Sequence, residues 1–113
     1  MNFEENAREY HKSGCNCAMA VYGAYAEKLG MTEEEALASA PLPRSEGGYC
    51  GAFLAGRKIL EKLKPEAVAD YEKKFLEIYG DTQCSVLIKM HGLKKNCNNY
   101  VGDAARLVEE ELN

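Results

Sequence analysis

Four of the five cysteines stand where the sequence predicts that a helix begins. These are Cys17, Cys50, Cys84 and Cys97. A helix N-terminus carries a partial positive charge and unpaired N–H groups, and both favour a thiolate over a thiol. The thiolate is the form of cysteine that attacks disulfides and binds metals. We therefore predict that these four residues form one site with redox or metal chemistry.

The spacing of the cysteines leaves the kind of chemistry open. The chain contains no C-x-x-C pair, so neither a thioredoxin-type dithiol nor a local zinc knuckle is present, and the fold must gather the sulfurs. Four thiolates suit Zn²⁺ or an iron–sulfur cluster, whereas two pairs suit disulfide exchange. His91 follows Cys84 by seven residues, so a Cys₃His set is also open, although a histidine near a helix C-terminus more often interacts with the helix dipole.

Cys50 lies in the stretch GGYCGAFLAG, residues 47–56. Each glycine weakens a helix by roughly 1 kcal/mol relative to alanine. The many glycines around the start of this predicted helix therefore need an explanation. We expect Gly47 and Gly48 to turn the chain into the helix, and Gly51 and Gly56 to let another helix approach closely. Because glycine neighbours leave its sulfur accessible, we predict Cys50 as the attacking thiol.

Cys15 differs from the other four because it precedes the second predicted helix. A packing role is expected for it, since buried cysteine behaves as a small hydrophobe. The alternative is a C-x-C redox pair with Cys17.

The elements that must position these residues are helices. Periodic apolar residues and capping residues predict a compact all-α bundle of about five to seven short helices. Thr32 and Glu35 form a capping box, and Gly30 and Gly80 end helices. The predicted helices cover 3–12, 17–29, a short segment after Thr32, 50–63, 65–79, about 82–90, and about 97 or 99 to 112.

Length and charge exclude several classes of protein. The 113 residues predict a single helical domain, 1–113, with a net charge of −4. Its lysines and arginines form no basic stripe, which argues against a nucleic-acid partner. No apolar run reaches the roughly 18 residues of a membrane span, and residues 1–14 lack the pattern of a secretory signal. We expect a cytoplasmic protein with reduced thiols, compatible with a homodimer.

The cysteine pattern resembles the family of redox-active cysteine proteins named for its C_GCAxxG_C_C motif. The matching residues are Asn16-Cys17-Ala18, Cys50-Gly51-Ala52, Cys84 and Cys97, over about residues 14–112. The resemblance implies a small helical protein whose four cysteines do redox or metal chemistry. A related module in split-Soret cytochromes is associated with an iron–sulfur centre. This chain departs from the motif at Ala55, where the family has glycine, and Gly56 follows one residue later.

The leading hypothesis is a small cytoplasmic protein that uses Cys17, Cys50, Cys84 and Cys97 in thiol–disulfide or electron-transfer chemistry. The first alternative is a metal-binding module in which the same four cysteines hold an iron–sulfur cluster or zinc. The second is a plain helical interaction domain. The redox partner, whether a protein or a small oxidant, is not specified by the sequence.

Overall fold

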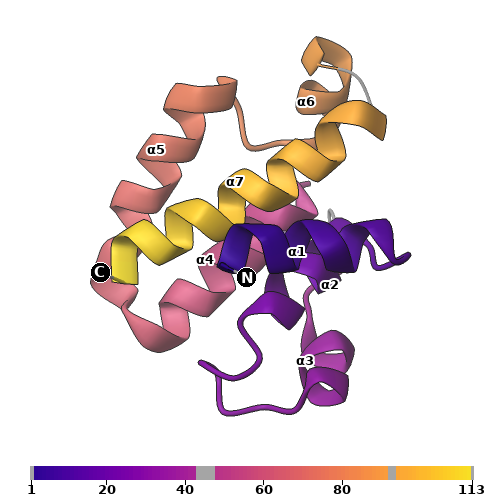
Figure 1. Ribbon diagram of the computed structural model, residues 1–113. Coiled ribbons are helices and arrows are strands. Elements are labelled where there is room, and N and C mark those ends of the chain that lie inside the picture. Colours follow the sequence, from indigo (N-terminus) through magenta and orange to yellow (C-terminus); the bar gives the residue numbers. More distant parts are fainter. Residues whose placement is uncertain (1, 43–47, 92–93, 113) are drawn as a thin grey trace.

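The computed structural model describes residues 2–42, 48–91 and 94–112 (Figure 1), and their side chains except those of 88 and 90–97. Within this part the chain forms seven α-helices and one short 3₁₀ helix, and it has no strand. The helices are α1 (Phe3–Lys12), α2 (Cys17–Ala24), α3 (Glu33–Ser39), α4 (Gly51–Leu63), η1 (Pro65–Ala67), α5 (Val68–Tyr79), α6 (Cys84–His91) and α7 (Lys94–Leu112). The predicted all-α fold is confirmed.

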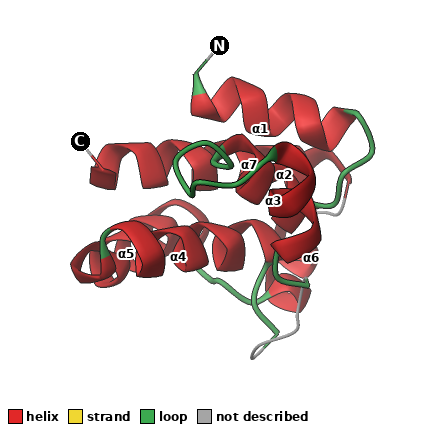
Figure 2. Cartoon of the chain, turned by 90° about the horizontal axis from the view of Figure 1, so that it is seen from below, coloured by secondary structure: helices red, strands yellow, loops and turns green. Residues whose placement is uncertain are grey.

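The long helix α7 is the centre of the packing. It contacts α1, α2, α4 and α5, and α2 in turn contacts α1, α3 and α4. Figure 2 shows α2 and α7 between α1 on one side and the α4–α5 pair on the other. The shared core is rich in small and aromatic side chains, which lets these short helices pack closely. It includes Ala18, Ala52, Ala104, Tyr25, Phe53, Tyr71 and Phe75.

Local capping chemistry accounts for several of the helix ends. The Asn16 side chain accepts a hydrogen bond from the Met19 N–H at 2.8 Å and so caps α2. Thr32 and Glu35 form the predicted capping box of α3. Gly80 ends α5 with a φ of 82°, in the left-handed region that favours glycine. These ends are the ones that side-chain identity predicts most directly.

Two helix boundaries differ from the prediction. Helix α2 ends at Ala24 rather than at Leu29, because Tyr25 turns inward and its hydroxyl donates a hydrogen bond to the Ala105 carbonyl at 2.8 Å. Residues 25–30 therefore continue as turns. Helix α7 begins at Lys94, so Cys97 is its fourth residue rather than its first or its cap. The other three cysteines lie at helix starts as predicted: Cys17 at α2, Cys50 at α4 and Cys84 at α6.

A feature without a sequence signal joins the starts of α4 and α6. Tyr49 and Gln83 form an isolated antiparallel β-bridge. On either side of it the Cys50 N–H donates to the Thr82 carbonyl at 2.7 Å, and the Cys84 N–H donates to the Gly48 carbonyl at 2.9 Å. Gly48 has a φ of 75°, and a β-carbon there would lie 2.6 Å from the Gln83 side chain. The turn predicted at Gly48 is confirmed; Gly47 lies outside the described residues.

Candidate functional site: the Cys17–Cys50 thiol pair

The sulfurs of Cys17 and Cys50 meet where the starts of α2 and α4 pack together. Cys17 is the first residue of α2, directly after its capping Asn16, and Cys50 is the residue that precedes α4. The two helices are in contact, and the Cys50 thiol donates a hydrogen bond to the Cys17 sulfur. This brings together two of the four cysteines predicted to converge.

Backbone amides of both helices point at the Cys17 sulfur. The N–H groups of Ala18 and of Cys17 itself come from α2, and the N–H of Ala52 comes from α4. Each is an unpaired donor of a helix first turn, where the helix dipole also favours negative charge. The sulfur of Cys17 therefore lies in a small anion-stabilising pocket built from two helix N-termini. The sequence signal for it is the small residue that follows each cysteine.

These contacts make Cys17 the thiolate of the pair. The hydrogen bond from Cys50 lowers the pKa of Cys17 most; burial opposes this, and the three amides lower it further, to about 7. The Cys17 thiol therefore loses its proton more readily than an ordinary cysteine, whose pKa is about 8.5.

Cys50 has the opposite character. Its pKa is raised, first because its thiol proton is held in the hydrogen bond to Cys17 and then because it is buried, with only 3 % of its surface exposed. The amides of Phe53 and Ala52 lower its pKa, but by less. The expectation that the sulfur of Cys50 is accessible is therefore wrong, because Cys50 is buried, whereas Cys17 is half-buried.

Tyr71 packs against the first turn of α4. Its ring is fully buried and stacked on Phe53 at 5.3 Å between centroids, and its hydroxyl donates to the Phe53 carbonyl at 2.9 Å. The pKa of Tyr71 is raised by burial, and an ionised Cys50 would raise it further, because the two side chains lie close together. No sequence pattern identified this tyrosine as part of the site.

The remaining cysteines are placed differently. Cys84 is half-buried at the first position of α6, and the backbone pairing with Gly48 holds it near the start of α4. The side chain of Cys97 lies outside the described residues. Cys15 is half-buried against the core. The C-x-C pair of Cys15 with Cys17 stays a prediction.

The same placement bears on the metal-binding alternative. Among the side chains that the structure describes, no three cysteines, histidines or carboxylates gather in a way that would hold a metal ion. Cys17, Cys50 and Cys84 thus do not form such a group with one another. The iron–sulfur or zinc site that the sequence leaves open as an alternative has no support in the described part, and the side chains of Cys97 and His91 lie outside it.

Comparison with known families decides the wider class. Residues 15–111 match the C_GCAxxG_C_C family, described as putative redox-active protein. The chain belongs to this family. No curated protein and no solved structure gives a significant match. The family's redox-active cysteines agree with the resemblance noted from the sequence, and the Cys17–Cys50 pair lies inside the matched region. Among the described residues no helix is both long and apolar enough to cross a membrane.

Asn16 allows the cap of α2 and the charge at Cys17 to be tested separately. We expect Asn16→Ala to lower the free energy of unfolding by about 1 kcal/mol, because the Met19 N–H loses its partner. Asn16→Asp keeps the cap but puts a carboxylate beside the sulfur, so it should preserve stability and raise the pKa of Cys17. Urea unfolding and the pH dependence of thiol alkylation measure the two effects. Equal stability of the two variants would contradict the capping role.

Proposed function

We propose that the protein is a thiol–disulfide redox protein in which Cys17 is the attacking thiolate and Cys50 the resolving thiol. The observation that carries this proposal is the hydrogen bond from the Cys50 thiol to the Cys17 sulfur. The same sulfur also accepts hydrogen bonds from backbone N–H groups at two helix starts. An attacking thiol works best when its pKa lies near the ambient pH, because it is then both ionised and nucleophilic. Cys17, with a pKa of about 7, meets this condition.

The reaction consists of two exchanges. The Cys17 thiolate attacks one sulfur of a substrate disulfide, forms a mixed disulfide with it, and releases the other half as a thiolate. That thiolate is a base and can accept the Cys50 proton. The Cys50 sulfur then attacks the Cys17 sulfur and releases the second half of the substrate. The substrate gains two electrons and becomes two thiols, and the protein gains a Cys17–Cys50 disulfide.

The contact between the sulfurs supports the second exchange. A disulfide needs its sulfurs at about 2.05 Å and its α-carbons within about 7 Å. Two thiols that already share a hydrogen bond need only a small approach. The burial of Cys50 also suits a resolving thiol, since it reaches the mixed disulfide from inside the protein while external disulfides reach only Cys17.

Cys84 and Cys97 enter the proposal as a second pair. They would reduce the Cys17–Cys50 disulfide by exchange and become a Cys84–Cys97 disulfide, which an external dithiol then reduces. They are not needed for the first oxidation. Replacing both by serine should therefore leave formation of the Cys17–Cys50 disulfide unchanged and affect only turnover.

The pH dependence of alkylation tests the role of Cys17. We expect the rate at which iodoacetamide modifies Cys17 to be half-maximal near pH 7, because the thiolate is the reactive form. Above that pH the rate reaches a plateau. Below it the rate falls about tenfold per pH unit as the thiolate is protonated. Peptide mass spectrometry assigns the modified residue.

Two variants of Cys50 separate the hydrogen bond from the rest of the pocket. Cys50→Ser keeps a hydrogen-bond donor next to Cys17. The midpoint, which is the pH of half-maximal alkylation of Cys17, should therefore stay near that of the unchanged protein. Cys50→Ala removes the largest cause of the lowered pKa, so the midpoint should rise towards the ordinary value of about 8.5. An unchanged midpoint in Cys50→Ala, or first modification at Cys50, would refute the proposal.

A further inference from the structure

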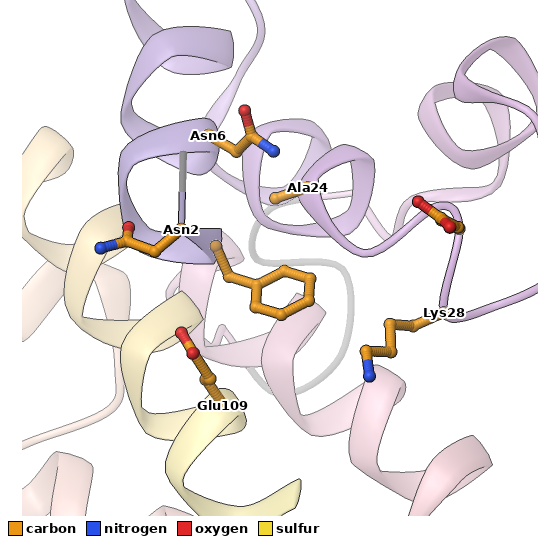
Figure 3. Close-up of a pocket in the computed structure, with 7 residues that line it drawn as sticks. Asn2, Asn6, Ala24, Lys28 and Glu109 are labelled. Carbon is orange, nitrogen blue, oxygen red and sulfur yellow. The ribbon is translucent and has the colours of Figure 1, made fainter.

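A cavity of about 590 Å³ opens at the end of α2 remote from the thiol pair (Figure 3). Ala24 lies on its wall, seven residues after Cys17 and thus about 10 Å further along the helix axis. Its volume is within the range of small-molecule sites in proteins. The residues that line it come from α1, α2, the turn that follows α2, and α7: Asn2, Phe3, Asn6, Ala24, Glu27, Lys28 and Glu109.

The cavity exists because α2 ends early. Tyr25 turns into the core, and the chain then folds back through residues 26–31 instead of continuing as a helix along α1. The Phe3 ring stacks on the ring of Tyr25 with 4.3 Å between centroids and 6° between planes. Tyr25 is fully buried and fixed by its hydrogen bond to α7, so it holds Phe3 in place. The result is a fixed aromatic surface inside the cavity.

The charged groups around this surface are of both signs. The Lys28 ammonium lies 5.9 Å from the centroid of the Phe3 ring, close enough for a cation–π interaction. Figure 3 shows that Glu109 reaches the cavity from α7 and Lys28 from the turn that follows α2, on different sides of the cavity. The pKa of Tyr25 is raised by burial and then by the charge of Glu109, so this carboxylate lies near the tyrosine on which Phe3 stacks. With Glu27, the lining carries two carboxylates and one ammonium.

We propose that this cavity binds an apolar α-amino acid in its zwitterionic form. The ligand's ammonium group would lie between Glu109 and the face of Phe3, its carboxylate at Lys28, and its side chain against Phe3 and Ala24. The amides of Asn2 and Asn6 can donate to or accept from either end of the ligand. The ligand thus matches an apolar surface, a negative group and a positive group that the fold already presents together.

The charge pattern favours a zwitterion over the two simpler ions. A plain anion would face both carboxylates. A plain amine would meet the carboxylates favourably, but it would also compete with the Lys28 ammonium for the aromatic face. A zwitterion removes this competition, because its carboxylate draws Lys28 away from the ring.

Binding of three matched probes to the full chain tests the proposal. L-phenylalanine carries both charges, phenethylamine lacks the carboxylate and phenylpropionate lacks the ammonium. We expect L-phenylalanine to bind most tightly, then phenethylamine, with phenylpropionate weakest. Amide chemical shifts in titrations of the isotope-labelled protein give both the affinity and the place of binding, which should include Phe3, Ala24 and Lys28.

Substitutions at the two charged groups give the sharpest outcome. Lys28→Gln should weaken the binding of L-phenylalanine by about three- to fivefold, the size expected of a solvent-accessible ion pair. The same substitution should strengthen the binding of phenethylamine, because the competing ammonium is gone. Glu109→Gln should weaken the binding of L-phenylalanine and of phenethylamine by a similar factor. Glu66→Gln, an exposed residue of η1 outside the cavity, is the control and should change neither. Thermal unfolding checks that each variant folds.

Several results would overturn the proposal: no shifts at the cavity with L-phenylalanine, equal affinity for the three probes, or a loss of phenethylamine binding in Lys28→Gln. The proposal is independent of the thiol chemistry. Cys17→Ser should bind L-phenylalanine as the unchanged protein does, so a failure of the redox proposal would not be mistaken for a failure of this one.

Discussion

Replacing Cys50 by alanine should stop disulfide exchange half-way, with half of the substrate left on Cys17. Cys17 keeps its place at the start of α2 and the amides of Ala18 and Ala52 near its sulfur, so it still attacks. Without Cys50 no neighbouring thiol resolves the mixed disulfide. An aromatic disulfide with a coloured thiol product should release two thiols from the unchanged pair but only one from Cys50→Ala, and the missing half should appear as added mass on Cys17.

The background for this experiment is a variant that retains only the pair. Serine at positions 15, 84 and 97 removes the other thiols, so every product belongs to Cys17 or Cys50. In that background Cys17→Ser should slow thiol release by at least about 20-fold at pH 7. Cys50 is buried, and even an ordinary cysteine is only a few per cent ionised at that pH. Complete release from Cys50→Ala, or an adduct on Cys50, would show that the roles are assigned wrongly.

Local residue chemistry predicted the helices and the ends at which the cysteines stand. Asn16, the Thr32–Glu35 box and Gly80 each end or begin a helix through their own side chain or backbone preference, so they can be identified without a tertiary structure. Cys17 and Cys84 were placed at helix starts for the same reason. The end of α2 was missed because the hydrogen bond of Tyr25 to Ala105, 80 residues later, determines it.

The pairing of the sulfurs is likewise a tertiary property. Four helix starts with thiols can combine in several ways, and only the packing of α2 on α4 brings Cys17 to Cys50. The sequence suggested that glycine neighbours expose Cys50, whereas the core closes over it and leaves Cys17 as the half-buried member. Which thiol ionises therefore depends on burial and on one hydrogen bond, neither of which has a local sequence signal.

Gly56 is the position where a single methyl group should destabilise the fold most. A β-carbon there would lie 2.7 Å from Cζ of Tyr71, with the Tyr71 hydroxyl closer still, and 3.1 Å from a methyl carbon of Val108. All three groups are buried, and the tyrosine is fixed by its hydrogen bond to Phe53. We expect Gly56→Ala to lower the free energy of unfolding by about 2 kcal/mol, since overpacking outweighs the higher helix propensity of alanine.

Gly102 offers a matched control, because it is also a buried glycine within a helix. The three heavy atoms nearest to a β-carbon there all belong to the guanidinium of Arg8, which is the far end of a flexible side chain. Gly102→Ala should therefore change stability by less than about 1 kcal/mol in either direction. Urea unfolding of the two variants makes the comparison, and equal free energies would contradict the close approach of α5 and α7 to α4.

A second substitution shows whether Tyr71 is the group that resists the added methyl. Tyr71→Phe removes the hydroxyl nearest to the new β-carbon, so Gly56→Ala should cost about 1 kcal/mol less in that background than in the unchanged protein. The same contact reaches the thiol pair, because Tyr71 holds the carbonyl of Phe53 three residues after Cys50. Gly56→Ala should thus also raise the alkylation midpoint of Cys17, while Gly102→Ala leaves it unchanged. A stability loss without this shift would separate the packing of α4 from the chemistry of Cys17.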